Sequence, residues 1–485
     1  MKLRVENLGP IKHAEIDLTK KFYVFVGYNN SGKTYMARLL SHLYSKAISG
    51  DSATIKEIAH LKRIEITRTL IDDTLKSTLI NLKYSFASYL KIPETHPALI
   101  NFKIRALDHD CAVQLLKNAS LKWRIELNYI DGFTTFYYLK KEANSLMIEI
   151  DVYDSPESLS RLKVDWVRRH QMNHTYAERQ QAVHNFNDRL NLEIRAFIKS
   201  IIFSVSNDFL PADRVFYTKF HKYVLTASKE ALDMIASTNT NDLEAIRSIS
   251  KNSLTADEDR IIQKLQRLTE NSSRLDAHLD LIENLKSILG GEILNKDVKG
   301  ISPVEFSLKT TEQKELDMYL ASSTANQLAL FYIYLKFWAI PKQNFLIIDE
   351  PEINLHPENQ LQLLNLLMKF ANRNDNKVLI TTHSTLMADA VNNHLHLGYL
   401  KDKMGAQAVQ QIIGKNELEI DLDAAMSHDD IGIYFFNGDR VVEYQIEDYG
   451  TTFRDFKQAE DKVKNTAFIL KDVISEYKDQ VEEYA

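Results

Sequence analysis

The sequence predicts an α/β fold built on a parallel β-sheet, and three observations lead to this prediction. A short run of β-forming residues at 22–26 is followed by a loop with two glycines and then by a helical pattern from about Lys33. Two further segments, at 344–348 and 377–380, each begin with one polar residue and continue with an apolar run, at 345–348 and 378–380, as strands buried on both faces do. Residues 301–415 alternate strand-like and helix-like segments, which is the pattern of βαβ units in a parallel sheet.

The elements before residue 157 fall into three groups. Residues 1–50 read as strand, strand, loop and helix, and residues 51–120 are mostly polar with helical spacing. Residues 121–152 alternate apolar and polar positions, with a hairpin signal at Asp131-Gly132. We therefore expect a β-meander of three strands attached to the core.

The second half of the chain returns from helices to the core. Residues 157–290 have helical patterns, and Gly290-Gly291 breaks them before the βαβ region begins. A strand pair around Asn437-Gly438 and a charged helix are expected near the C-terminus. We expect four parts: an N-terminal part of the core at 1–50, an inserted lobe at 51–300, a C-terminal part of the core at 301–415, and an extension with a charged helix at 416–485.

Composition limits the class of protein. The chain has 485 residues, a net charge of −6 and a single cysteine, Cys111. One cysteine excludes a disulfide scaffold and a cysteine-based zinc site, and it fits the reducing cytoplasm. The most apolar stretch, 328–340, is too short to cross a bilayer, so we expect a buried helix and no membrane contact. Any DNA-binding surface on an acidic chain must be a local patch.

The loop at 27–34 has the residues that bind phosphate. It matches G-x-x-x-x-G-K-[ST] in full, between a strand and a helix. Glycines let successive backbone N–H groups point at phosphate oxygens, and the helix N-terminus adds its positive end. Lys33 is expected on the β and γ phosphates of ATP, and the Thr34 hydroxyl is an expected Mg²⁺ ligand. The residues expected to contact the nucleotide here are Gly27, Asn29, Asn30, Ser31, Gly32, Lys33 and Thr34.

A carboxylate pair follows the second buried run. Asp349 and Glu350 come at its C-terminal end, where α/β sheets place their ligands. Asp349 is expected to hold Mg²⁺, and Glu350 is expected to polarise the attacking water as a general base. An Asp-Glu pair by itself is weak, but together with the phosphate-binding loop it indicates hydrolysis of a nucleoside triphosphate.

Two further polar segments complete the expected site. The third buried run ends in Thr381-Thr382-His383-Ser384, and His383 at this position can reach the γ-phosphate and the attacking water. Ser322 and Ser323 precede the buried helix, where hydroxyl residues form either a phosphate-binding cap or an ordinary N-cap.

The order and spacing of these motifs resemble the ABC-type ATPases of the SMC, RecF and OLD group, whose heads are P-loop NTPases. In this resemblance, 27–34 is the Walker A motif, Asp349-Glu350 is Walker B, Ser322-Ser323 falls on the signature motif, and His383 is the switch histidine. The run 350–357 resembles the E-E-P-E-x-x-L-H-P run of OLD-like ATPases, and 209–214 resembles their P-A-[ED]-R segment. The group fills the long gap between Walker A and Walker B with an inserted lobe.

The resemblance implies an ATPase that converts ATP and water to ADP and phosphate, with ATP and Mg²⁺ as its ligands. It also implies self-association, because two nucleotides are sandwiched between two heads in this group. The chain has Thr324 where the signature usually has glycine, and a Cβ at this position narrows the approach of the backbone to phosphate. No glutamine is assigned to the Q-loop.

The chain is similar to the stand-alone OLD-like ATPases of prokaryotic antiphage systems of the Septu, PARIS and retron-associated types. Such ATPases oligomerise and hold a separate effector, often a nuclease. The acidic clusters at 421–423 and 429–430 lack a Toprim-length pattern around them and are expected to be solvated charge. The cluster at 108–111 lacks a partner motif for a metal site.

The alternative is a DNA-repair or chromosome-maintenance ATPase that acts directly on DNA. Basic stretches at 161–163 and 168–170 could contact phosphates, although such stretches are more often solvated helix faces. A transporter ATPase is disfavoured by the long insertion.

Overall fold

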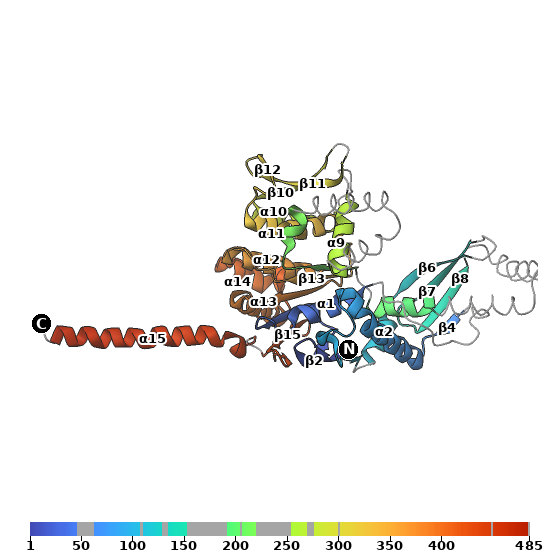
Figure 1. The fold of residues 1–485 in the computed structure, drawn as a ribbon, viewed down its shortest axis with the longest axis horizontal. Coiled ribbons are helices and arrows are strands. Elements are labelled where there is room, and N and C mark those ends of the chain that lie inside the picture. Colours follow the sequence, from blue (N-terminus) through green and yellow to red (C-terminus); the bar gives the residue numbers. More distant parts are fainter. Residues whose placement is uncertain are drawn as a thin grey trace, which may run out of the picture. The chain divides into compact units, whose positions relative to one another are not determined.

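A computed structural model describes most of the chain as two compact units (Figure 1). The first unit consists of Met1–Leu8, Ala14–Thr19 and Arg38–Asn207, and the second of Gly9–His13, Lys20–Ala37 and Asp208–Ala485. The residues that the structure describes are 1–45, 63–106, 110–128, 134–152, 192–203, 206–219, 254–268, 276–298, 301–447 and 450–483.

A six-stranded sheet forms the centre of the second unit. Its strands, in spatial order, are β16 (Val441–Glu443), β15 (Ile431–Phe436), β3 (Phe22–Gly27), β14 (Lys377–Thr382), β13 (Asn344–Asp349) and β9 (Ser206–Leu210). The four strands from β15 to β13 pair in parallel, and β3, β13 and β15 are buried along their whole length. Strands buried on both faces need continuous apolar runs, which residues 22–26 and 345–348 supply. The expected α/β fold is confirmed.

The register of the sheet brings the ends of the buried strands to one edge. Asp349 at the end of β13 is opposite Thr381 of β14, and Thr382 is opposite Val26 of β3. Gly27 is in turn opposite Phe436, the last residue of β15. The four carboxyl ends therefore lie side by side, although the motifs are far apart in sequence.

The first strand of the pair expected around Asn437-Gly438 is β15, and it belongs to the six-stranded sheet. It pairs in parallel with β3 and forms an antiparallel hairpin with β16 around Asn437-Gly438. The hairpin itself was expected. The parallel pairing was not, because the sequence pattern of β15 contains no signal for which strand it joins.

Helices pack around this sheet. The helices that follow the strands or pack near them are α1 (Lys33–Tyr44), α11 (Ser323–Ile333), α12 (Pro357–Ala371), α13 (Thr385–Met404) and α14 (Ala406–Lys415). The expected buried helix at 328–340 is α11, extended by a π-helical segment, Tyr334–Trp338. Residues 325–333 of α11 are all buried. None of the described helices is both long enough and apolar enough to span a bilayer.

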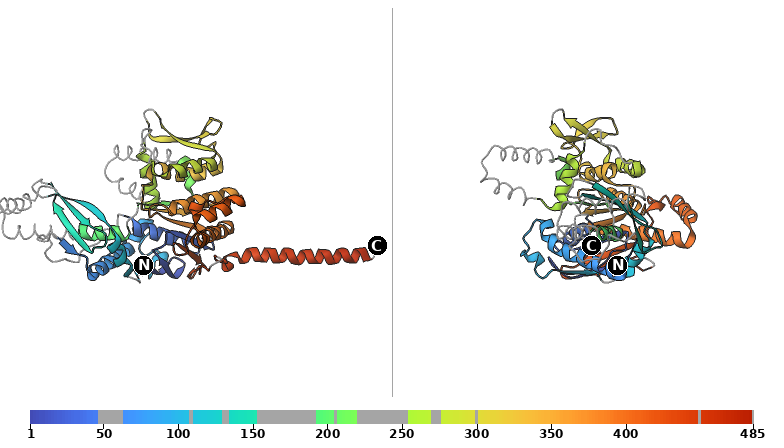
Figure 2. Two further views of the ribbon diagram at one scale, coloured as in Figure 1. Left: turned by 180° about the vertical axis from the view of Figure 1, so that it is seen from behind. Right: turned by 90° about the vertical axis from the view of Figure 1, so that its right-hand side faces the viewer.

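A three-stranded antiparallel sheet corrects one expectation. Residues 301–317 were assigned to the parallel sheet, but they form β11 (Ile301–Thr310) and β12 (Glu315–Asp317) beside β10 (Gly291–Val298). A short turn between β11 and β12 can only join antiparallel neighbours. Figures 1 and 2 show α10 (Leu279–Leu289) and α11 between this sheet and the parallel sheet.

The expected β-meander is confirmed within the first unit. Strands β6 (Leu121–Asn128), β7 (Thr134–Lys141) and β8 (Met147–Val152) pair antiparallel in succession. The turn expected at Asp131-Gly132 lies outside the described residues. The remaining strands and longer helices among the described residues are β1 (Lys2–Leu8), β2 (Ile11–Asp17), β4 (Arg63–Glu65), β5 (Lys103–Ala106), α2 (Arg68–Leu90), α3 (Asp110–Asn118), α6 (Arg214–Lys219) and α9 (Ala256–Gln266).

The helix expected near the C-terminus is α15 (Arg454–Glu483). The four parts expected at 1–50, 51–300, 301–415 and 416–485 stay a prediction. By contacts alone, the chain divides at residues 8–9, 13–14, 19–20, 37–38 and 207–208.

Candidate nucleotide-binding site

The loop between β3 and α1 has a backbone that only glycine can adopt at two positions. Gly27 has φ +148°, and a Cβ there would lie 2.2 Å from the carbonyl oxygen of Phe436. Gly32 has φ +96°, and a Cβ there would lie 2.7 Å from a side-chain carbon of Ile11. The Ser31 side chain is buried, and its hydroxyl has no hydrogen-bond partner within the described chain. The tightly curved backbone of this loop and the buried Ser31 hydroxyl therefore suit an anion such as a phosphate group.

Lys33 lies at the first turn of α1 and its ammonium folds back onto the loop. Its Nζ donates to the carbonyl oxygens of Gly27 at 3.0 Å and Tyr28 at 2.8 Å. Burial lowers the pKa of Lys33 to about 8, against the opposing effect of carboxylates that include Glu350 and Asp349. The ammonium is thus held at the loop, and its pKa lies closer to neutral pH than that of an ordinary lysine.

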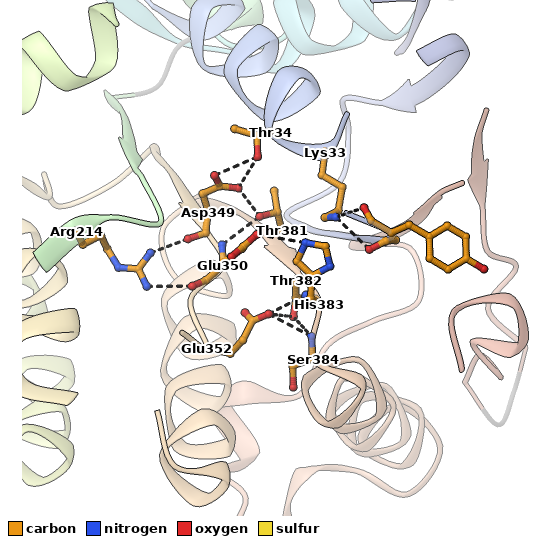
Figure 3. A network of polar contacts seen from close by, with 12 residues as sticks. Lys33, Thr34, Arg214, Asp349, Glu350, Glu352, Thr381, Thr382, His383 and Ser384 are labelled. Carbon is orange, nitrogen blue, oxygen red and sulfur yellow. Dashed lines mark hydrogen bonds and ion pairs between the residues drawn. The ribbon is translucent and has the colours of Figure 1, made fainter. Parts of the chain in front are cut away.

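Thr34 and Asp349 meet at the adjacent strand end (Figure 3). The Thr34 hydroxyl lies 3.1 Å from both carboxylate oxygens of Asp349, and the Thr381 hydroxyl also donates to Asp349. A hydroxyl and a carboxylate are hard oxygen ligands, and Mg²⁺ in phosphate sites typically takes only one or two protein ligands of this kind. The pair therefore fits Mg²⁺ bound together with a nucleotide.

Glu350 has an unusual backbone that directs its side chain toward His383. Its φ is +48°, and its N–H donates to both the carbonyl oxygen of Thr381 at 3.0 Å and the Thr381 hydroxyl at 3.1 Å. Glu350 Oε1 lies 3.2 Å from His383 Nε2. Burial, and then the neighbouring carboxylates of Asp349 and Glu352, raise the pKa of Glu350.

His383 follows β14, and its surroundings disfavour the charged form of its imidazole. Burial and then the Lys33 ammonium lower the pKa of His383. A neutral imidazole can donate one hydrogen bond to the Glu350 carboxylate while its other nitrogen accepts. A carboxylate with a raised pKa beside a neutral imidazole is the arrangement expected of a base that accepts a proton.

Glu352 supports the strand end that carries His383, and the sequence analysis did not single it out. Its Oε1 accepts from the Thr382 hydroxyl at 2.7 Å, from the His383 N–H at 2.7 Å and from the Ser384 N–H at 3.2 Å. Ser384 caps α13 by accepting from the Met387 N–H at 3.2 Å. The signal in the sequence was the second carboxylate of the run at 350–357, two residues after Glu350.

Arg214 is the second residue that the sequence analysis did not assign to the site. Its side chain is almost completely buried, and its five N–H donors all reach backbone carbonyl oxygens. The acceptors are Pro211 at 3.0 Å, Gln327 at 3.3 Å, Asp349 at 2.7 Å, Glu350 at 3.1 Å and Pro351 at 3.4 Å. Burial lowers the pKa of Arg214 to about 10. The guanidinium thus ties the end of β13 to α11, and the signal was the segment at 209–214.

Ser322 and Ser323 are not brought together with the other expected site residues. Ser322 is the N-cap of α11, and its hydroxyl accepts from the Ala325 N–H at 3.1 Å. Asn326 donates to the carbonyl oxygens of Ala321 and Ser322, both at 3.0 Å. Within one copy of the chain, these residues therefore form the ordinary cap that the sequence left open as an alternative.

The acidic clusters noted in the sequence make structural contacts. Asp421 pairs with Lys369 at 2.7 Å, and Asp430 pairs with Lys21 at 3.0 Å. Asp108 and His109 lie outside the described residues, as do the basic stretches at 161–163 and 168–170. Within the described ranges, no group of three or more histidine, cysteine, aspartate or glutamate side chains is arranged to hold a metal ion by itself.

Comparisons with known proteins identify similar structures and a family for this chain. Among solved structures, the chain is similar to an SMC head domain from Thermotoga maritima, with 10% identity, coverage of 92% of this chain and 98% of that chain, and a TM-score of 0.28. It is also similar to the Smc head domain from Pyrococcus furiosus bound to the C-terminal domain of ScpA, with 12% identity, coverage of 97% and 98%, and a TM-score of 0.33. Scores this low carry no further argument.

No curated protein matches the sequence. The family model described as an AAA ATPase domain matches residues 1–388. That range contains the phosphate-binding loop, the carboxylate pair and His383. Because the match spans most of the sequence, the chain belongs to the AAA ATPase domain family.

Proposed function

We propose that the chain binds ATP with Mg²⁺ and hydrolyses it to ADP and phosphate. The proposal is carried by one observation: Glu350 Oε1 lies 3.2 Å from His383 Nε2 at the same sheet edge as Lys33 and the Thr34–Asp349 pair. Hydrolysis of the γ-phosphate needs a base, a histidine beside it, an ammonium that binds the phosphates and oxygen ligands for Mg²⁺.

Each side chain has a distinct role in this proposal. Lys33 and the loop N–H groups bind the phosphates, and Thr34 and Asp349 would hold Mg²⁺, which would neutralise charge on the phosphate oxygens. Glu350 accepts a proton from the attacking water, and His383 orients that carboxylate through its hydrogen bond.

A steady-state assay of phosphate release tests this proposal. The wild-type chain should release phosphate from ATP only with Mg²⁺. Lys33→Ala should abolish both the binding of ATP and the release of phosphate. Lys12→Ala is the matched control, because Lys12 is an exposed lysine that pairs with Asp439 at the surface. Equal activity of the Lys33 and Lys12 variants would contradict the assignment of the site.

We further propose that ATP brings two copies of the chain together, with α11 of one copy facing the loop of the other. The proposal is supported by the exposure of Tyr319 and Leu320, which directly precede the Ser322 cap. Large apolar side chains exposed beside a helix N-terminus suit a surface that becomes covered. The measurement is the molar mass of a hydrolysis-deficient chain in solution with and without ATP, and no change in mass would contradict the proposal.

The biological role that we propose is control of a separate effector, such as a nuclease, in prokaryotic antiphage defence. It is supported by the resemblance of the run at 350–357 to OLD-like ATPases, and by the ATP site itself. Purification of a tagged chain expressed with its native neighbouring genes tests this role. An associated second polypeptide is expected, and its absence from a chain that hydrolyses ATP would refute the effector proposal while leaving the ATPase proposal intact.

A further inference from the structure

The middle of helix α15, from Val463 to Val473, carries apolar side chains that no other described element of its unit covers. The exposed fractions are 70% for Val463, 56% for Leu470 and 55% for Val473. Figures 1 and 2 show α15 as a straight helix with no other described element of its unit beside its C-terminal half. Apolar side chains this exposed over several turns mark a surface that binds another protein segment.

Only the start of α15 is fixed to the rest of its unit. Phe453 is buried and Phe456 packs against the main core, while Lys457 pairs with Asp389. From residue 461 to residue 471, every side chain is exposed. The helix therefore presents about 23 residues, roughly 34 Å of its length, away from these anchoring contacts.

Several apolar positions of α15 repeat every seven residues. The series begins at Phe456, which packs against the core, and continues beyond the anchor with Val463, Leu470 and Tyr477, while Val473 falls three residues after Leu470. A seven-residue repeat keeps its stripe facing a single partner helix when the two helices wind around each other with a left-handed twist. The repeat therefore indicates a helix as the partner, rather than a flat surface.

The charges on the same segment indicate which helix is the partner of α15. Residues 461–471 contain three lysines and one carboxylate, whereas residues 472–483 contain one lysine and five carboxylates. Two parallel copies would place like charges side by side, but two antiparallel copies place each basic half against an acidic half. The helix is thus complementary to itself when it is reversed.

We propose that α15 pairs with the α15 of a second copy of this chain in an antiparallel coiled coil over residues 461–483. This contact uses none of the nucleotide-binding residues. It therefore needs no ATP, and it links copies independently of the ATP-dependent association proposed above.

Sedimentation velocity of the full chain tests this pairing, in a Lys33→Ala background and without nucleotide so that ATP-driven association is absent. Over about 1 to 100 μM, a range suited to a short interface, the parent chain should form a dimer. Val463→Asp combined with Leu470→Asp should raise the dimer dissociation constant at least about tenfold, because charges on the stripe would have to be buried.

Phe468→Asp is the matched control for this variant. Phe468 is exposed to 66% and lies on the same helix, but it falls outside the seven-residue repeat. It should leave the dimer unchanged. A parent chain that stays monomeric to 100 μM, or a Phe468 variant that dissociates as strongly as the stripe variant, would overturn the proposal.

Charge reversal tests the antiparallel direction. Replacing Lys462, Lys464 and Lys471 with glutamate makes both halves acidic and should dissociate the dimer. Adding Asp479→Lys, Glu482→Lys and Glu483→Lys in the same chain reverses both halves and should restore it. If the combined variant stays as monomeric as the first, the antiparallel pairing is wrong.

Discussion

The guanidinium of Arg214 donates through Nη2 to the carbonyl oxygen of Glu350 at 3.1 Å. Through Nη1 it also holds the carbonyl oxygen of Asp349 at 2.7 Å. Glu350 needs such support because its φ of +48° is in the left-handed region, which costs a non-glycine residue roughly 1–2 kcal/mol. Arg214 is therefore a positioning residue. Its five donors all reach backbone carbonyl oxygens, so it acts by fixing the backbone of Glu350, the proposed base.

We expect Arg214→Lys to lower kcat about tenfold while the affinity for ATP changes little. Lysine has three donors in place of five, so at least two buried carbonyl oxygens lose their partner, and the free energy of unfolding should fall by about 2–5 kcal/mol. Single-turnover hydrolysis and equilibrium nucleotide binding measure the two effects separately. Arg440→Lys, at an exposed position, is the control and should change neither. An equal loss of binding and hydrolysis would show that Arg214 acts only through general stability.

Glu350→Gln should keep ATP binding and slow hydrolysis by about 10²- to 10⁴-fold, the range for loss of a general base. The amide keeps the size of the side chain and its contact with His383, but it cannot accept a proton from water. Phosphate release and binding of a labelled nucleotide measure the two properties. Glu358→Gln, which removes an exposed carboxylate in the first turn of α12, should behave as wild type. Hydrolysis at the wild-type rate would exclude Glu350 as the base.

His383→Gln should leave binding intact and lower kcat about tenfold to a hundredfold, because the Glu350 carboxylate loses its imidazole neighbour. The pH dependence provides a second measurement. The wild-type kcat should fall on acidification as Glu350 takes up a proton, and its raised pKa places this fall above pH 4.5. His383 also gains a proton in the acid range, because its pKa is lowered from the usual value, so the wild-type profile should report two ionisations. The variant should show a single ionisation, and an unchanged two-proton profile would contradict the assignment of the second proton to His383.

The sequence alone allowed much of this site to be placed, and the reason is local. Gly27 to Thr34 form a contiguous motif, and its glycines indicate the backbone conformation that it adopts. Asp349 follows a continuous apolar run. Arg214 could not be assigned in this way, because its partners come from three separate segments. These partners are backbone carbonyl oxygens, which every residue has, so no residue type in the sequence indicates them. The parallel pairing of β15 with β3 was missed for the same reason, since strand order depends on tertiary contacts.

Thr34→Val should raise the Mg²⁺ concentration that gives half-maximal hydrolysis by about tenfold to a hundredfold, because the methyl group cannot act as a ligand. Valine has nearly the volume of threonine, so the substitution should leave the first turn of α1 in place. A titration of Mg²⁺ at saturating ATP measures the shift. Thr34→Ser retains the hydroxyl that lies 3.1 Å from Asp349 and should keep nearly the wild-type requirement. Equal shifts in the two variants would mean that the hydroxyl is not the ligand.

The lowered pKa of Lys33 predicts that ATP affinity depends on pH. In the free chain this pKa is about 8, so the ammonium that attracts the phosphates is present below pH 8 and is lost as the pH rises through that value. The dissociation constant of ATP, measured by calorimetry from pH 7 to pH 9.5, should therefore rise above pH 8 by up to about tenfold per pH unit. Lys33→Arg remains charged throughout, so any binding that it retains should be flat over this range. A flat wild-type profile would mean that Lys33 stays charged in the free chain, so that the neighbouring carboxylates outweigh its burial.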